Sequence, residues 1–177
     1  MVALLLIAAL AHAKELAGVT LADTVIVGGE AVKLNGLGLR ERYFLDIYVG
    51  ALYLQHPTHD AATAIAADEP KRVLMHFTYK SITRDQMVAT FVEGFGDMTA
   101  GPHAASVAKV GSWIPAGGVK GGDEIGFDYL PGVGTSMTFN GRVLGTIPGV
   151  EFMKLIFGVY LGPKPPTEAL KAGLLSG

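Results

Sequence analysis

The sequence predicts an α+β fold, in which antiparallel strands and grouped helices share one core. Residues 71–79 and 124–130 alternate apolar and polar side chains, which indicates strands. Residues 83–98 instead repeat apolar side chains at helical spacing, behind Thr83 as a suitable N-cap. Asn140-Gly141 is typical of a two-residue hairpin turn. Because the helical segments interrupt runs of strands and do not alternate with them one by one, we expect an antiparallel sheet.

The other elements follow from the same patterns of period, capping and turn residues. They are two short strands at 24–27 and 31–34, a long strand at 34–55, a helix at 58–69 with Thr58 as N-cap, a helix at 103–110, hairpin strands at 135–139 and 142–147, an apolar helix at 151–160, and a last helix capped by Thr167.

Length and composition indicate one well-packed domain. The chain has 177 residues, of which 50% are hydrophobic and 17% charged. Its net charge is −2 and no basic cluster occurs, so we expect no nucleic-acid partner. The chain has no cysteine, which excludes disulfides, thiolate nucleophiles and zinc-thiolate sites.

The first thirteen residues, MVALLLIAALAHA, are uncharged and almost wholly apolar. The run is too short to span a bilayer, and Ala11-His12-Ala13 has the small-x-small form of a signal-peptidase site. We therefore expect a signal peptide over residues 1–13, a single mature domain over 14–177 without a membrane segment, and an exported, periplasmic protein. The alternative is an N-terminal helix packed on the core.

Two motifs that suggest chemistry have simpler interpretations. Gly36-Leu37-Gly38 lacks the third glycine and the following helix of a dinucleotide site, so we expect a bulge or a close backbone approach. His56 and His59 flank a proline turn, which is typical of a solvated loop and not of a metal site. No Gly-x-Ser-x-Gly elbow occurs. We expect no metal and no cofactor.

The segment LNGLGLRERYFLDIYVGALYLQ, residues 34–55, contains the main candidate site. One face of this expected strand is uniformly apolar and should meet the core. The other face carries Arg40, Arg42 and Tyr48 among aliphatic residues. Such a face is either the wall of a polar-headed pocket or a half-exposed surface, and Arg40 is either its anchor or an exposed residue at a strand end.

Three stretches resemble the chalcone isomerase-like family, in its bacterial exported branch: LNGLGLR at 34–40, DIYVGALYL at 46–54 and FGVYLG at 157–162. The resemblance implies an open-faced β-sandwich, with a large antiparallel sheet, helices packed on one face and a ligand cleft between them. The family holds plant enzymes that close a chalcone to a flavanone, and non-catalytic members that bind fatty acids.

The resemblance also implies roles for single residues. Arg40 matches the arginine that holds the reacting oxygen in the enzymes and the carboxylate in the binders. Tyr48 falls where the enzymes carry threonine and the fatty-acid binders tyrosine. The enzymes' tyrosine and asparagine on the helix beside the cleft fall near Arg84 and Phe91, and the threonine of their last helix falls near Val159. These departures remove most of the enzymes' hydrogen-bonding groups, so we expect a non-catalytic protein.

The expected binding residues are Arg40, Tyr48, Met87, Phe91, Phe95 and Val159. Arg40 and Tyr48 are eight residues apart, or about 26 Å in one straight strand. They can share a carboxylate only if the chain bends or turns around residues 41–44; otherwise Arg42 or Tyr79 becomes the partner.

We expect this site to bind a small amphipathic carboxylic acid, such as a fatty acid. One alternative is an isomerase or lyase of the chalcone isomerase type, in which Arg40 and Tyr48 polarise the carbonyl of an enone-like substrate. The other alternative is a partner-binding scaffold with a closed cleft, in which Arg40 forms an ion pair with Asp46 or Glu93.

Overall fold

The computed structural model of the protein describes residues 13–177, so the predicted signal peptide lies outside the described residues apart from Ala13. The strands are β1 (Ala13–Leu16), β2 (Val19–Ala22), β3 (Thr24–Val27), β4 (Glu30–Arg42), β5 (Leu45–Leu54), β6 (Lys71–Phe77), β7 (Ser81–Ile82), β8 (Val119–Lys120), β9 (Glu124–Leu130), β10 (Gly134–Phe139) and β11 (Arg142–Ile147). The helices are α1 (Ala61–Ala66), α2 (Arg84–Phe95), the 3-10 turn η1 (Gly96–Thr99), α3 (Ala104–Trp113), α4 (Val150–Leu161) and α5 (Glu168–Leu174).

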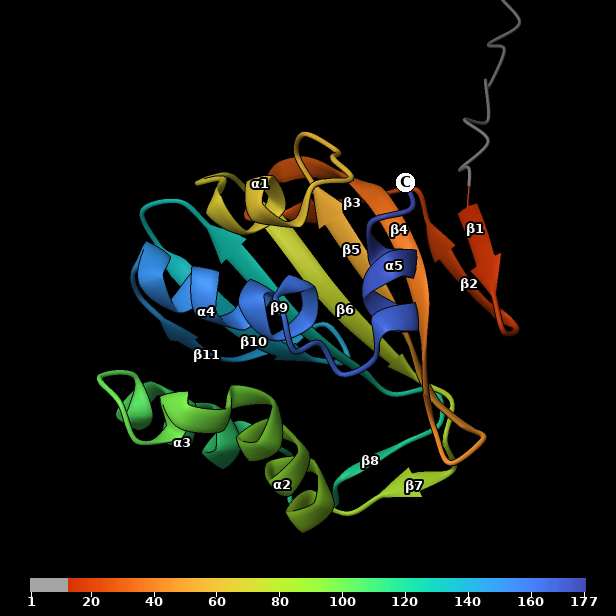
Figure 1. Ribbon diagram of the computed structural model, residues 1–177, viewed down its shortest axis with the longest axis vertical. Coiled ribbons are helices and arrows are strands. Elements are labelled where there is room, and N and C mark those ends of the chain that lie inside the picture. The colour runs from red at the N-terminus through yellow and green to blue at the C-terminus, as the bar shows by residue number, and fades with distance from the viewer. Residues whose placement is uncertain (1–12) are drawn as a thin grey trace, which may run out of the picture.

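Seven strands form one large antiparallel sheet in the order β11-β10-β9-β6-β5-β4-β3. The order follows the chain except between β6 and β9, which are neighbours in the sheet but not in the sequence. The segment between them contains the short β7–β8 pair and, between these two strands, α2, η1 and α3, which lie outside the sheet (Figure 1). Helices α4 and α5 lie across one face of the sheet, which confirms the predicted α+β architecture (Figure 1). Within residues 13–177, no helix has the length and apolar character needed to cross a bilayer.

The main core lies between this sheet face and the helices, all five of which contribute buried side chains to it. Strand β5 supplies Tyr48, Leu52 and Leu54 to this core. These residues belong to the face that the sequence left ambiguous, so that face is the one that meets the helices. The uniformly apolar face of β5 has a different neighbour: Val49 and Ala51 pack in a smaller core with residues of the β1–β2 hairpin.

Helix α5 is held unusually close to the sheet by the glycines of β4. A Cβ atom on Gly36 would lie 2.2 Å from the carbonyl oxygen of Gly173, and one on Gly38 would lie 2.3 Å from that of Leu170. The ladder between β4 and β5 also shifts register between Leu34 and Gly36. The interpretation of these paired glycines as a bulge and a close backbone approach is therefore confirmed.

Lys71 is an unusual core residue, because its side chain is completely buried. Its ammonium donates a hydrogen bond to the carbonyl of Ala64, at 2.6 Å, and lies 5.1 Å from the centre of the Phe157 ring. Burial lowers the pKa of this ammonium to about 8. Lys71 thus brings a charge into the core with one carbonyl and one aromatic ring to stabilise it.

Two sequence predictions about elements are wrong. The short strand expected at 31–34 and the single long strand expected at 34–55 are instead β4, which includes the first of them, and β5; the chain turns between β4 and β5 at Tyr43 and Phe44, with positive φ values of 52° and 65°. Helix α1 is capped by Asp60 and not by Thr58, since the Asp60 carboxylate accepts a hydrogen bond from the Thr63 amide at 2.7 Å.

The other predicted caps and the hairpin turn are confirmed. Thr83 caps α2 within a complete capping box, Thr167 caps α5, and Asn140-Gly141 joins β10 to β11.

Candidate functional site

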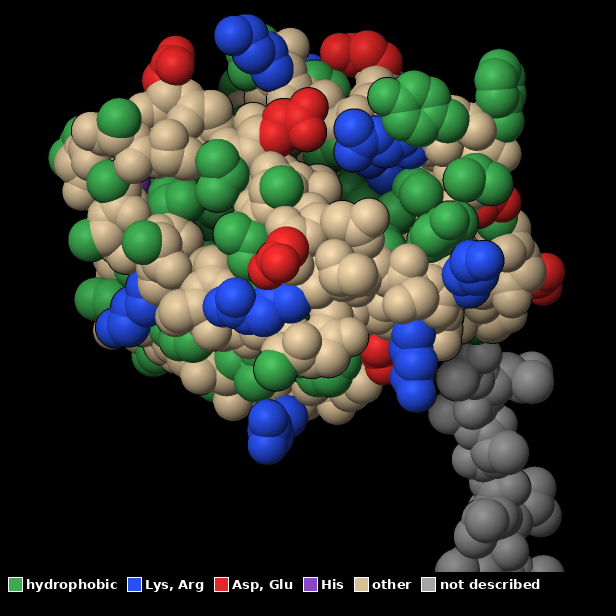
Figure 2. Space-filling model, turned by 90° about the horizontal axis from the view of Figure 1, so that it is seen from below, with side chains coloured by type: hydrophobic (Ala, Val, Ile, Leu, Met, Phe, Trp, Pro, Cys, Tyr) green, Lys and Arg blue, Asp and Glu red, His purple; other side chains and the backbone are tan. Residues whose placement is uncertain are grey.

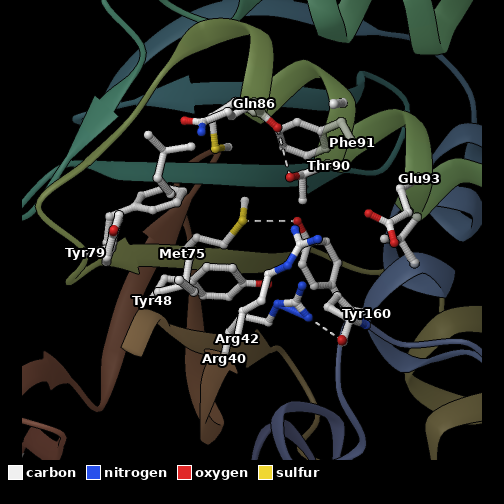
Figure 3. Close-up of a pocket in the computed structure, with 18 of the residues that line it drawn as sticks. Arg40, Arg42, Tyr48, Met75, Tyr79, Gln86, Thr90, Phe91, Glu93 and Tyr160 are labelled. Carbon is white, nitrogen blue, oxygen red and sulfur yellow. Dashed lines mark hydrogen bonds between the residues drawn. The ribbon is translucent and has the colours of Figure 1, made fainter. Parts of the chain in front are cut away.

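A cavity of about 650 Å³ lies between the sheet, helix α2 and the end of helix α4. Its wall combines apolar and aromatic side chains with a few charged groups, as is usual for small-molecule sites of this volume. Figure 3 shows the side chains of β4, β5, β6, α2 and α4 around it. The lining residues are Arg40, Arg42, Ile47, Tyr48, Met75, Phe77, Tyr79, Ser81, Ile82, Gln86, Met87, Ala89, Thr90, Phe91, Glu93, Gly94, Val159, Tyr160, Lys164, Pro165 and Pro166.

The β4–β5 hairpin brings Arg40 and Tyr48 together. The two residues are direct partners across the antiparallel ladder, and both line the cavity. Directly opposed residues have Cβ atoms about 4.5–5.5 Å apart, in place of the 26 Å of a straight strand. The chain turns at residues 43 and 44, within the range 41–44 in which the sequence required a turn. This turn therefore allows Arg40 and Tyr48 to contribute to one site.

Arg40 is half-buried and keeps most of its donors available. One guanidinium nitrogen donates a hydrogen bond to the carbonyl of Pro166, in the segment between α4 and α5 (Figure 3). A guanidinium has five N–H donors in a fork that suits a carboxylate. Within residues 13–177 Arg40 forms no ion pair with Asp46 or Glu93, which the closed-cleft scaffold required.

The charges along the cavity favour an anion. Arg40, Arg42 and Lys164 line it together with one carboxylate, that of Glu93. Arg42 and Lys164 are exposed. The positive groups gather where the hairpin meets the proline segment after α4, so the polar end of the cavity lies there.

Two buried tyrosines lie beside Arg40. Burial raises the pKa of Tyr48 and of Tyr160 well above the ordinary value, although the Arg40 charge lowers both to a lesser degree. The Tyr160 hydroxyl donates to the sulfur of Met75 at 3.2 Å, and the Tyr48 ring lies edge-on to Phe77 with centroids 5.6 Å apart (Figure 3). Both phenols therefore stay neutral at physiological pH, and Tyr48 can donate a hydrogen bond.

Most of the predicted apolar residues line the cavity. Met87 and Phe91 reach it from α2 and Val159 reaches it from α4. Phe95 does not line it: this side chain is 2% exposed and stacks behind Phe91, with ring centroids 6.3 Å apart. Phe95 therefore supports the wall without forming it.

Several polar side chains of α2 are engaged within the helix or with α3. The Arg84 guanidinium points toward α3, where it donates to the carbonyls of Ile114 and Gly111 at 3.2 and 3.3 Å. The Gln86 side-chain oxygen accepts the Thr83 amide in the capping box, and the Thr90 hydroxyl donates to the Gln86 carbonyl at 2.9 Å. The Thr90 hydroxyl and the Gln86 side-chain oxygen are thus engaged within the helix, whereas the Gln86 side-chain amide nitrogen can donate to a ligand.

Sequence reasoning missed several lining residues, among them Tyr160, Met75, Lys164 and Pro166. Tyr160 lies within the FGVYLG motif at 157–162, so this motif could have indicated it. Met75 lies on one face of the alternating segment 71–79, whereas no local pattern marks Lys164 and Pro166.

The two histidines near the proline turn have ordinary partners. His56 Nδ1 lies 2.6 Å from a carboxylate oxygen of Glu69, and His59 Nδ1 lies 2.7 Å from the carbonyl of Leu175. No group of three or more potential metal ligands occurs between residues 13 and 177.

An open antiparallel sheet, helices on one of its faces and a cavity with an arginine at its polar end define the class of this protein. The chain belongs to the chalcone isomerase-like family, whose family model matches residues 13–176. Among solved structures it is similar to a fatty-acid binding protein from Arabidopsis thaliana, with a TM-score of 0.74 at 14% identity, over 93% of this chain and 96% of that one. No curated protein sequence matches it.

Proposed function

We propose that this protein binds a fatty acid, or a closely similar amphipathic carboxylic acid, without transforming it. The observation that carries the proposal is the pairing of Arg40 with Tyr48 at the polar end of a largely apolar cavity. Arg40 donates a forked hydrogen bond to the carboxylate, and Tyr48 adds a neutral donor. Met87, Phe91 and Val159 receive the hydrocarbon tail.

Affinity and selectivity then come from different parts of the ligand. A charge-assisted hydrogen bond contributes about 1.5–3 kcal/mol net. The tail contributes about 0.8 kcal/mol for each buried CH₂ group, before the costs of association are subtracted. The tail therefore dominates affinity, while Arg40 sets the orientation and the choice of head group. We expect tail length to be recognised loosely and a carboxylate strictly.

Two further observations support a binding role. The structural neighbour from Arabidopsis thaliana, which has the same fold, is described as a fatty-acid binding protein. The three cationic side chains along the cavity, against one carboxylate, also favour an anionic head group. The proposal includes export to the periplasm, which depends on the sequence of residues 1–13 alone.

An isomerase of the chalcone type is the second candidate. Arg40 and the neutral phenols of Tyr48 and Tyr160 favour it, because they could polarise a carbonyl. The α2 wall argues against it, because Met87 and Phe91 make much of that wall apolar and the Thr90 hydroxyl already donates to the Gln86 carbonyl. The two functions differ in the ligand that stays bound: an intact acid for the first, an enone that is consumed for the second.

Native mass spectrometry of the gently purified protein tests the proposal. We expect the wild-type protein to retain a carboxylic acid, or to take up added dodecanoic to octadecanoic acids, and Arg40→Ala to lose it. Arg142→Ala, an exposed arginine at the start of β11, is the matched control and should retain the ligand. A wild-type protein that remains empty with every acid would refute the proposal, and turnover of an added chalcone would favour the second candidate.

A further inference from the structure

The tip of the β4–β5 hairpin exposes three consecutive apolar side chains. Phe44 is completely exposed, Tyr43 is 81% exposed and Leu45 is 48% exposed. Most exposed hydrophobic residues on a soluble domain occur singly, whereas a cluster marks an interaction site. Since the hairpin forms one end of the cavity wall, this cluster lies beside the polar end of the proposed site.

The backbone conformation of this tip is one that aromatic residues disfavour, so the geometry of the turn does not explain why they occur there. Tyr43 and Phe44 both adopt positive φ, a conformation that is unfavourable for residues with a large side chain. The same chain builds its β10–β11 turn, also with two positive φ values, from Asn140 and Gly141, which are the residues that favour this geometry. The β4–β5 turn therefore combines an unfavourable backbone conformation with two largely exposed aromatic rings.

The charges of the hairpin are separated between its two faces. Arg40 and Arg42 line the cavity, and the Arg42 guanidinium lies 5.4 Å from the centre of the Tyr43 ring. Glu41 and Asp46 are paired across the two strands, and neither lines the cavity. The cavity side of the hairpin thus carries its two arginines, with the Tyr43 ring against one of them, while Glu41 and Asp46 do not line the cavity.

This combination fits the surface of an anionic bilayer. Tyrosine and other aromatic rings favour the interfacial region of a membrane, and nearby arginines are attracted to anionic lipid head groups. Viewed from the end of the molecule that carries the hairpin, hydrophobic and basic side chains lie side by side around a hollow (Figure 2). A flat protein partner would also cover apolar residues, but it would not explain why the cations share the side of the tip that faces the lipid-sized cavity.

We propose that the Tyr43–Phe44 tip inserts into the head-group region of an anionic membrane and places the mouth of the cavity on the lipid surface. This inference goes beyond the proposed function and can be tested without any fatty acid. Its consequence for the proposed function is that a poorly soluble acid moves between bilayer and cavity without crossing bulk water.

The test is co-sedimentation of the full chain with vesicles of phosphatidylcholine and phosphatidylglycerol, compared with vesicles of phosphatidylcholine alone. The informative variant is Tyr43→Asn together with Phe44→Gly, because it copies the Asn140-Gly141 turn and so should fold at least as stably as the wild type. We expect the wild type to bind the anionic vesicles, and the double variant to bind them with an affinity lower by about tenfold or more. Val143→Asn removes another exposed apolar side chain, which is 59% exposed, and should leave vesicle binding unchanged.

A local measurement complements the binding assay. Phe44→Trp should shift its fluorescence to shorter wavelength when anionic vesicles are added, whereas the wild type, whose single tryptophan is Trp113, should not. Equal vesicle binding by wild type and double variant would overturn the proposal, as would the absence of binding. Self-association of the wild type that the double variant loses, without vesicle binding, would assign the tip to a protein interface and would also overturn it.

Failure of this inference is distinguishable from failure of the proposed function. Fatty-acid uptake in the absence of vesicles depends on Arg40 and not on the tip. A double variant that binds acid normally but not vesicles would support both proposals, whereas one that binds neither would overturn the inference that the tip acts on the membrane separately from the acid site.

Discussion

Replacing Arg40 with methionine is expected to weaken the binding of hexadecanoic acid by about 12- to 140-fold. The figure is the net value of a charge-assisted hydrogen bond, about 1.5–3 kcal/mol, converted at 1.4 kcal/mol for each factor of ten. Methionine keeps much of the apolar stem that lines the cavity and removes the guanidinium. Isothermal titration calorimetry with the ligand-free protein measures the change in dissociation constant.

The corresponding alcohol, hexadecanol, is the control ligand, because it has the same tail and no carboxylate. Its affinity should change by less than about threefold in Arg40→Met, since the tail contacts are intact. Arg40 also donates to the Pro166 carbonyl, so the substitution could loosen the segment between α4 and α5. An equal loss for acid and alcohol would show that Arg40 shapes the cavity through Pro166, and an unchanged affinity for both would refute its role as the carboxylate anchor.

Three other predictions concern stability and processing. The pKa of Lys71 is about 8 in the folded protein and 10.5 in the unfolded chain, so the unfolded chain binds more protons between these values. The free energy of unfolding, measured by urea titration, should therefore rise by about 1–2 kcal/mol from about pH 7.5 to 9.5. Lys71→Met should abolish this rise, and a rise that persists in the variant would contradict the assignment to Lys71. Gly38→Ala should lower the free energy of unfolding by about 1–3 kcal/mol, because the new Cβ would lie 2.3 Å from the Leu170 carbonyl oxygen. In the same titrations, the control Gly158→Ala in α4 should raise the free energy of unfolding by up to about 1 kcal/mol, because a Cβ there would have no atom within 4 Å. If export occurs as predicted, the intact mass of the secreted protein will correspond to a chain that begins at Lys14, and retention of residues 1–13 would contradict it.

The fold was largely predictable, because its signals are local. The helical period after Thr83, the cap at Thr167 and the Asn140-Gly141 turn each depend on a few neighbouring residues, and the structure has them all. The turn at Tyr43 and Phe44 was missed as an element boundary because it contains none of the residues that favour positive φ. Only the distance between Arg40 and Tyr48 required a turn there.

The site was predictable only in part. Arg40 and Tyr48 lie in one motif-rich segment, and the opposing strands bring them together. Lys164 and Pro166 reach the cavity because α5 packs against the glycines of β4, which is a tertiary contact that no local pattern reveals. The error for Phe95 has a similar origin, since helical spacing identifies the buried side of α2 but not which of its residues has a void in front of it.

The segment between β6 and β9 supplies one wall of the cavity independently of the large sheet that supplies the other. Helices α2 and α3 leave and rejoin the fold through β7 and β8, which are two residues long and pair with each other. The arginine and tyrosine lie on the sheet, whereas α2 supplies much of the opposite wall. A change in the length or sequence of this inserted segment would therefore alter one wall of the cavity and leave Arg40 and Tyr48 in place on the sheet.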